Sequence, residues 1–118
     1  MIHFFDTGIA AAYGVSEAIL LHNIYYWCEK NRANGIHEHD GLFWTYNSIR
    51  AFAALFPYIS EKQIRNALAH LVEEGLIETG HYNENPHDRT LWYAVTEKGE
   101  QTVKMSACIL PKGQMYSK

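Results

Sequence analysis

The sequence predicts an α+β fold, and three features support this prediction. Apolar residues recur at helical spacing in several segments, most clearly over residues 61–74. Two short apolar and aromatic runs, residues 76–79 and 91–95, are typical of strands and flank the turn-rich sequence GHYNENPHDR. The chain has 118 residues, of which 47% are hydrophobic, and this suits one domain with its own core. We therefore expect helices packed against a small antiparallel sheet.

The N-terminal part is expected to hold two helices. Asp6 is a good N-cap for a short helix through Tyr13, which Gly14 would end in a left-handed conformation. Ser16 would cap the second helix, with Val15 packed onto its next turn. This second helix carries an apolar stripe that we expect to face the core: Leu20, Leu21, Ile24, Trp27 and Cys28.

A separate face of the second helix carries Ile19, Tyr25 and Tyr26, which is more apolar than a free surface requires. A helix buried on two sides within one chain is the favoured explanation. A homodimer interface is the alternative.

The middle of the chain reads as a loop, a strand and a helix. Residues 34–41 are polar and contain two glycines, and residues 43–46 (FWTY) are aromatic and suited to a strand. Asn47 or Ser48 would cap a third helix with apolar residues at helical spacing. Pro57 is expected to stop that helix, because its ring cannot continue the hydrogen-bond ladder.

Residues 61–74 form the clearest predicted helix. Ser60 and Gln63 match a capping box, and Ile59 is placed to pack onto the first turn. Gly75 supplies the C-terminal stop. The expected inward stripe consists of Ile64, Ala67, Leu68, Leu71 and Val72.

The remaining elements complete a recognisable plan. Strands 76–79 and 91–95 should pair as a hairpin with a long loop, and Thr96 would cap a weaker last helix over residues 98–107. Trp92 and Tyr93 must point to opposite sides of their strand, so one of them is expected to face outward. This order is that of a winged helix-turn-helix, with the turn PYIS between its two helices and residues 81–89 as the wing.

We assign residues 1–107 to this winged helix-turn-helix domain, with an extra N-terminal helix and a two- to three-stranded antiparallel wing sheet. Residues 108–118 are interpreted as a C-terminal tail or a truncated linker.

The outward face of helix 61–74 has the chemistry of a DNA contact. Arg and Lys can pair with guanine, Asn can bond adenine, and Ala is small enough to meet a thymine methyl group. The residues of this face are Lys62, Arg65, Asn66, Ala69 and His70. Glu73 and Glu74 would be repelled by phosphate, so we expect the N-terminal half of the helix to approach DNA. Further candidate contacts from the first helix, the turn and the wing are Ser48, Arg50, Tyr58, Ser60, His87 and Arg89, together with Asn83.

The overall charge sets a limit on this hypothesis. Ten Lys and Arg residues stand against thirteen Asp and Glu residues, which gives a formal net charge of −3. No overall basic field attracts nucleic acid, so double-stranded DNA binding must depend on a local patch. Surface helices also carry Lys, Arg and Asn without any ligand, and a winged helix that binds protein is the alternative.

Other site types have weaker support. Residues 37–40 (HEHD) offer metal-ligand types, but their spacing fits no strong zinc pattern, and a solvated polar loop is favoured. No phosphate-binding glycine loop, nucleophile elbow or HExxH motif is present, so we expect neither an enzyme nor a cofactor. The aromatic residues Trp44, Tyr46, Trp92 and Tyr93 are interpreted as strand partners in preference to a platform for single strands.

The sequence also bears on location and redox state. Cys28 and Cys108 form no CxxC pair and are expected to be reduced thiols. No segment resembles a signal peptide or a membrane span, so we expect a soluble cytoplasmic protein that does not contact a membrane.

Three stretches of residues 1–99 carry a resemblance to a known family. They contain the motifs WTYNS, LFPYxS, QIRxAL and DRTxWY, which are more specific than the general winged-helix pattern. In these motifs the chain resembles the N-terminal winged-helix domain of phage and prophage replication initiators of Gram-positive bacteria, the replisome-organiser or DnaD-like proteins.

The resemblance implies origin binding, recruitment of a helicase loader or another replisome protein, and self-association. It places the recognition positions at Ser60, Lys62, Gln63, Arg65 and Asn66, and the wing positions at Tyr82, Asn83, Asp88 and Arg89. Asp88 and Arg89 have a structural alternative, in which they bond each other or the strand backbone to set the wing.

The C-terminus departs from the family pattern, because such initiators usually continue into a second domain. The chain is therefore either a piece of an initiator or a free-standing small protein. In the second case, a transcriptional regulator or a competitor of the full-length initiator is the alternative function.

Overall fold

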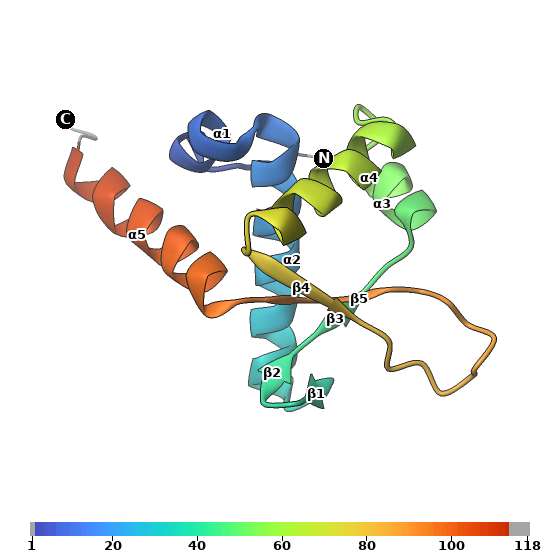
Figure 1. Cartoon of the computed structure of the whole chain (residues 1–118). Coiled ribbons are helices and arrows are strands. Elements are labelled where there is room, and N and C mark those ends of the chain that lie inside the picture. The colour runs from blue at the N-terminus through green and yellow to red at the C-terminus, as the bar shows by residue number, and fades with distance from the viewer. Residues whose placement is uncertain (1, 114–118) are drawn as a thin grey trace.

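The computed structural model describes the backbone of residues 2–113 and the side chains of residues 2–105. Five helices and two small antiparallel sheets form a mixed α+β fold in this part of the chain (Figure 1). The elements are, in order, α1 (Thr7–Tyr13), α2 (Val15–Asn34), β1 (Glu38–His39), β2 (Leu42–Phe43), β3 (Thr45–Tyr46), α3 (Ile49–Leu55), α4 (Glu61–Glu73), β4 (Ile77–Gly80), β5 (Trp92–Val95) and α5 (Glu97–Gly113). The predicted α+β class is confirmed.

The three-stranded sheet has the order β3-β5-β4, and all its pairings are antiparallel. Tyr93 on the central strand β5 lies opposite Thr45 on one side and Thr79 on the other. The predicted hairpin of two strands around a long loop is confirmed as β4 and β5. The loop projects from the body on the side away from α5 (Figure 1).

The predicted strand 43–46 is divided between the two sheets. Phe43 belongs to β2 and pairs with Glu38 of β1, whereas Thr45 and Tyr46 form β3 and pair with β5. The prediction of an irregular polar loop over residues 34–41 is therefore wrong in part, because it contains β1. Asp40 and Gly41 turn this hairpin with positive φ values of 54° and 78°, as a two-residue turn of type I′ requires.

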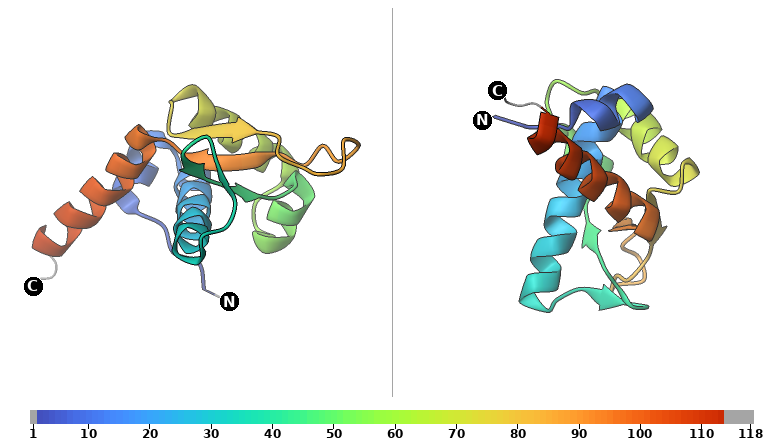
Figure 2. Two further views of the ribbon diagram at one scale, coloured as in Figure 1. Left: turned by 90° about the horizontal axis from the view of Figure 1, so that it is seen from below. Right: turned by 90° about the vertical axis from the view of Figure 1, so that its left-hand side faces the viewer.

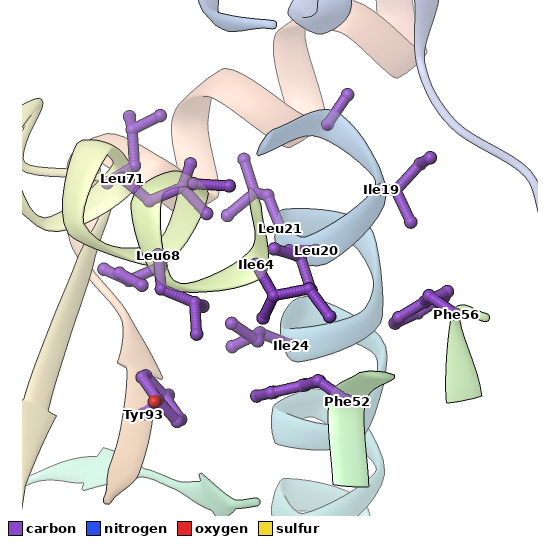
Figure 3. Close-up of a cluster of buried hydrophobic side chains, with 14 of the residues drawn as sticks. Ile19, Leu20, Leu21, Ile24, Phe52, Phe56, Ile64, Leu68, Leu71 and Tyr93 are labelled. Carbon is purple, nitrogen blue, oxygen red and sulfur yellow. The ribbon is translucent and has the colours of Figure 1, made fainter. Parts of the chain in front are cut away.

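The main core lies between α2, α4 and the inner face of the sheet (Figure 3). Ile64, Leu68 and Leu71 of α4 point toward α2, which presents residues that are fully buried: Leu20, Leu21 and Ile24. Phe52 of α3 and Tyr93 of β5 complete this cluster, with ring centroids 5.9 Å apart. The predicted inward stripes of both helices are thus largely confirmed.

Four details of α2 differ from prediction. Gly14 is the only residue between α1 and α2; its N–H donates to the Ala10 carbonyl and its own carbonyl accepts from Ala18. The helix therefore begins at Val15, which leaves no capping role for Ser16, and Val15 is exposed in place of packing onto the next turn. Gly14 has a φ of 122° and a ψ of 153°, outside the left-handed helical region that we expected. Trp27 of the predicted core stripe is 40% exposed.

The apolar face of Ile19, Tyr25 and Tyr26 is covered in part by the chain itself. Ile19 belongs to the main core and is only 7% exposed, so it is not available as a dimer contact. Tyr25 is half-buried, and Tyr26 is exposed beside Trp27. The prediction that this face of α2 is buried within the chain therefore holds for Ile19 but not for Tyr26, which is exposed.

The caps around α3 and α4 are those that the sequence predicts. Ser48 Oγ accepts the Ala51 N–H at 3.0 Å, and Ser60 and Gln63 form both hydrogen bonds of a capping box. Gly75 follows α4 with a φ of 76°. Two details differ, since α4 ends at Glu73 and Val72 is 41% exposed instead of belonging to the core.

The other face of the sheet has a smaller core of its own. Trp44, Trp92 and Ala94 are buried there, with Leu42 and Tyr82 packed against them. Trp92 and Tyr93 do point to opposite faces, but both are buried, so the prediction that one of them faces outward is wrong. Leu42 of the β1–β2 hairpin and Tyr82 pack against this cluster, and the sequence did not predict that they would cover it.

Two buried polar groups join α2 to the sheet. Asn31 Nδ2 donates to the Trp44 carbonyl at 2.7 Å, and the Cys28 thiol donates to the Tyr93 carbonyl at 3.6 Å. Burial raises the pKa of Cys28 to about 11, so this thiol stays protonated at neutral pH.

Helix α5 begins where the sequence predicts, with Thr96 Oγ1 accepting the Gly99 N–H. It continues to Gly113, beyond the expected domain end at residue 107. The helix contacts β5 and α1, and its C-terminal end extends away from the other elements (Figure 2). The side chain of Cys108 lies outside the described residues. Among the described helices, none combines the length and apolar character that crossing a membrane requires.

Candidate nucleic-acid interface

The outward face of α4 is open to solvent. Lys62, Arg65, Asn66 and Ala69 are all exposed, as the helical spacing predicts. Within the described part of the chain, the side chains of Lys62, Arg65 and Asn66 have no hydrogen bond or ion pair, so they are free to meet a ligand. The opposite face of the same helix is anchored in the core by Ile64 and Leu71, which fixes the direction in which these side chains project.

His70 differs from the free side chain that we expected on this face. Its Nδ1 lies 2.6 Å from Glu17 Oε2 on α2, and its Nε2 lies 3.7 Å from Glu74 Oε2. The hydrogen bond to Glu17 raises the pKa of His70, and the charges of Glu17, Glu74 and Glu73 act in the same direction. His70 therefore links α4 to α2 through Glu17, and it also lies close to the carboxylate of Glu74 on its own helix.

The predicted contacts near the helix-to-helix turn are of two kinds. Ser48, Ser60 and Gln63 use their side chains to cap α3 and α4, so they shape the turn. Tyr58 is 57% exposed, and its hydroxyl lies 2.7 Å from His3 Nδ1. Arg50 is exposed on α3 and has no ion pair with any described residue.

The side-chain amide of Asn83 stabilises the β4–β5 loop by hydrogen bonds. Its Nδ2 donates to the carbonyls of Asp88 and Thr90 at 3.0 and 2.8 Å, and its Oδ1 accepts the Trp92 indole N–H at 2.7 Å. The amide is thus used within the loop, which differs from the predicted DNA contact. Asp88 Oδ1 accepts the N–H of Thr90, two residues along the loop and outside β5, and this hydrogen bond lowers the pKa of Asp88.

Of the other predicted wing residues, two have exposed side chains and one is bonded within the chain. The side chains of His87 and Arg89 are exposed, and Arg89 makes no ion pair with Asp88 or any other described residue. Tyr82 is tied to the β1–β2 hairpin, because its hydroxyl donates to Asp40 Oδ2 at 2.9 Å and its ring stacks on His39 at 4.1 Å. The sequence carried one signal for this hairpin, the Asp40-Gly41 turn, but none for its contact with the β4–β5 loop.

The residues 37–40 that offered metal-ligand chemistry lie at this contact. Among the described residues, no three His, Cys, Asp or Glu side chains are grouped closely enough to hold a metal ion. His37 and His39 instead pack edge-on to Trp92, at 5.1 and 5.6 Å.

No protein-family model matches the chain, and no curated protein or solved structure matches it significantly.

Proposed function

We propose that this chain is a winged helix-turn-helix protein that binds double-stranded DNA with α4 as its recognition helix. The order β3-β5-β4, the short turn between α3 and α4, and the projecting β4–β5 loop support the fold assignment. The single observation that carries the function is the set of exposed, unpaired side chains Lys62, Arg65 and Asn66 on the N-terminal half of α4. These side chains can read base edges in the major groove.

The acidic end of α4 sets how the helix would meet DNA. Glu74 faces His70, whereas Glu73 is exposed and would repel phosphate. The N-terminal half therefore enters the groove and the C-terminal end tilts away. Arg50 on α3 and Arg89 on the wing are exposed on neighbouring elements and supply the phosphate contacts.

The setting that we propose is replication initiation in a phage or prophage, with a helicase loader or another replisome protein as partner. Support for this setting comes only from the resemblance in the motifs WTYNS, LFPYxS and DRTxWY.

The proposal is tested by selecting duplexes from a random pool and measuring binding by fluorescence anisotropy. Arg65→Ala should weaken binding to the selected duplex about 10- to 100-fold and relax the preference at one base position, because it removes a bidentate base contact. Arg32→Ala is the matched control, since Arg32 is exposed on α2 and paired with Glu29 at 3.1 Å. A pool without an enriched motif, together with equal binding by Arg65→Ala and wild type, would reject DNA recognition by α4.

A further inference from the structure

A cavity of about 610 Å³ opens between the base of the β4–β5 loop and the β1–β2 hairpin. None of its lining residues belongs to α3 or α4, so it is separate from the proposed recognition helix. Its walls combine aromatic rings with acidic side chains, and this combination defines what it can bind.

The aromatic part of the cavity is preorganised. Trp92 lines the cavity and is only 6% exposed, and its indole N–H donates to Asn83 Oδ1. Tyr46 lies against Trp92 with ring centroids 4.6 Å apart, and its own ring is half exposed. Tyr82 is fixed by its stacking on His39 and its bond to Asp40. Rings held in this way lose little side-chain freedom when a ligand binds.

The charged part of the cavity is uniformly acidic. Glu38, Glu84 and Asp88 line it, and no Lys or Arg does. Among the described residues, none donates a hydrogen bond to the carboxylates of Glu38 and Glu84 or forms an ion pair with them, so their charges are not neutralised locally. A phosphate or another anion would be repelled, whereas a cation would be attracted.

We propose that this cavity binds an alkylammonium group, a cationic nitrogen that carries methyl or methylene groups. Aromatic faces attract such a group through the negative face of their π system, and the carboxylates add electrostatic attraction. The apolar carbons around the nitrogen contact the rings, which a hydrated metal ion cannot do. The group could belong to a free small molecule or to the lysine side chain of a protein.

The first experiment compares two probes of nearly equal shape on the full chain without DNA. Choline carries a trimethylammonium group, and its neutral isostere carries a tert-butyl group in the same place. In NMR titrations we expect choline to shift the Trp92 indole N–H and the backbone signals of residues 82–85, and to bind about tenfold more tightly than the isostere. Equal binding of the two probes, no binding of choline, or shifts confined to other regions would each overturn the proposal.

Variants test the two parts of the cavity separately. Tyr46→Leu and the double variant Glu38→Gln with Glu84→Gln should each weaken choline binding about tenfold, because one removes an aromatic face and the other removes charge. All three side chains are exposed, and none of them belongs to a buried cluster. Tyr26→Leu is the matched control, since Tyr26 is an equally exposed tyrosine on α2 outside the cavity. Choline affinity that is unchanged in both cavity variants would overturn the proposal.

A third arm identifies the source of the ligand. A lysine residue blocked at both backbone ends, offered free and methylated at its ammonium group, represents the side chain of a protein. Binding of either form at least as tight as that of choline assigns the cavity to a protein partner, and tighter binding of choline assigns it to a free small molecule. DNA binding by α4 is measured in the same variants, so failure of one proposal is distinguished from failure of the other.

Discussion

His70 joins the two helices that carry the core, through its contact with Glu17 on α2. The hydrogen bond and the surrounding carboxylates favour the protonated ring, which raises the pKa of His70 in the folded chain. In the unfolded chain the pKa is expected to be near the ordinary value of about 6.5. The stabilisation is therefore fully present below about pH 6.5 and is lost as the pH rises through the raised pKa of the folded state.

We predict that His70→Gln removes part of the pH dependence of stability. The melting temperature of the wild-type chain should fall more between about pH 6 and pH 8 than that of the variant, because only the wild type loses a charged partner for Glu17. Thermal unfolding followed by circular dichroism measures this difference. His81→Gln is the control, because His81 is exposed on the loop after β4. A variant with the same pH profile as the wild type would contradict the assignment.

Residue types alone could not separate the free side chains from the occupied ones. Lys62, Arg65 and Asn66 are exposed because they lie opposite a strong apolar stripe, and helical spacing was enough to predict this. Asn83 has the same amide chemistry as Asn66, but its loop folds back so that every polar atom of the amide is used. That arrangement depends on residues that come together only in the folded loop.

The close approach of Gly99 to the Leu76 carbonyl is another contact that the sequence alone does not predict. A Cβ atom at this position would overlap the carbonyl oxygen of Leu76, because the first turn of α5 lies directly on the chain between α4 and β4. In the sequence, Gly99 reads only as a poor helix former in a weak helix.

At the scale of elements, α4 shows how local chemistry defines a helix. Ser60 Oγ accepts the Gln63 N–H at 3.1 Å, and Gln63 Oε1 accepts the Ser60 N–H at 3.0 Å. All participants lie within four consecutive residues, so the sequence was sufficient to predict the start of the helix. The same capping fixes the angle at which α4 leaves the turn and thereby presents Lys62.

We predict that Ser60→Ala lowers the free energy of unfolding by about 1 kcal/mol, because it leaves a helix N–H without its side-chain acceptor. Urea denaturation measures the change. Ser60→Asp is the matched control, since a carboxylate keeps the acceptor and favours the positive end of the helix dipole, so it should retain wild-type stability. A loss of equal size in Ser60→Asp would show that the effect does not arise from capping.

Element boundaries that depend on neighbours were harder to predict. Helix α2 begins at Val15 because Gly14 serves α1 and α2 at once, and a local cap rule cannot detect a shared residue. The run FWTY is divided because its first part pairs with β1 and its last part with β5, which is 46 or more residues away in the sequence. Local signals thus defined most of the helix boundaries, whereas the limits of β3 depend on its long-range pairing with β5.

At the scale of the whole molecule, charge is arranged by region. The exposed basic residues Lys62 and Arg65 lie on α4, whereas Glu38, Glu84 and Asp88 line the cavity between the β4–β5 loop and the β1–β2 hairpin. With a net charge of −3, the chain as a whole repels DNA weakly, and only the α4 side favours approach. The two proposed sites therefore have opposite charge preferences and would not compete for one ligand.

This arrangement predicts a shallow dependence of DNA binding on salt. Basic residues that can reach the duplex are Lys62, Arg65, Arg50 and Arg89, so about four phosphate contacts are the upper limit and log Kd should change with log salt concentration by a slope of about 3.6 at most. Arg50→Ala should lower that slope by about one, because it removes one phosphate contact and no base contact.

The measurement is anisotropy on the selected duplex between about 50 and 300 mM salt, a range in which counterion release dominates the change in affinity. Lys30→Ala is the control, because Lys30 lies over the Trp27 ring on α2, at 5.1 Å from its centroid, and should leave the slope unchanged. A slope near eight would require about twice as many phosphate contacts as the four cations of this face can make. Such a result would place the DNA on a different surface, since an acidic chain can reach that value only by using most of its ten basic residues at once.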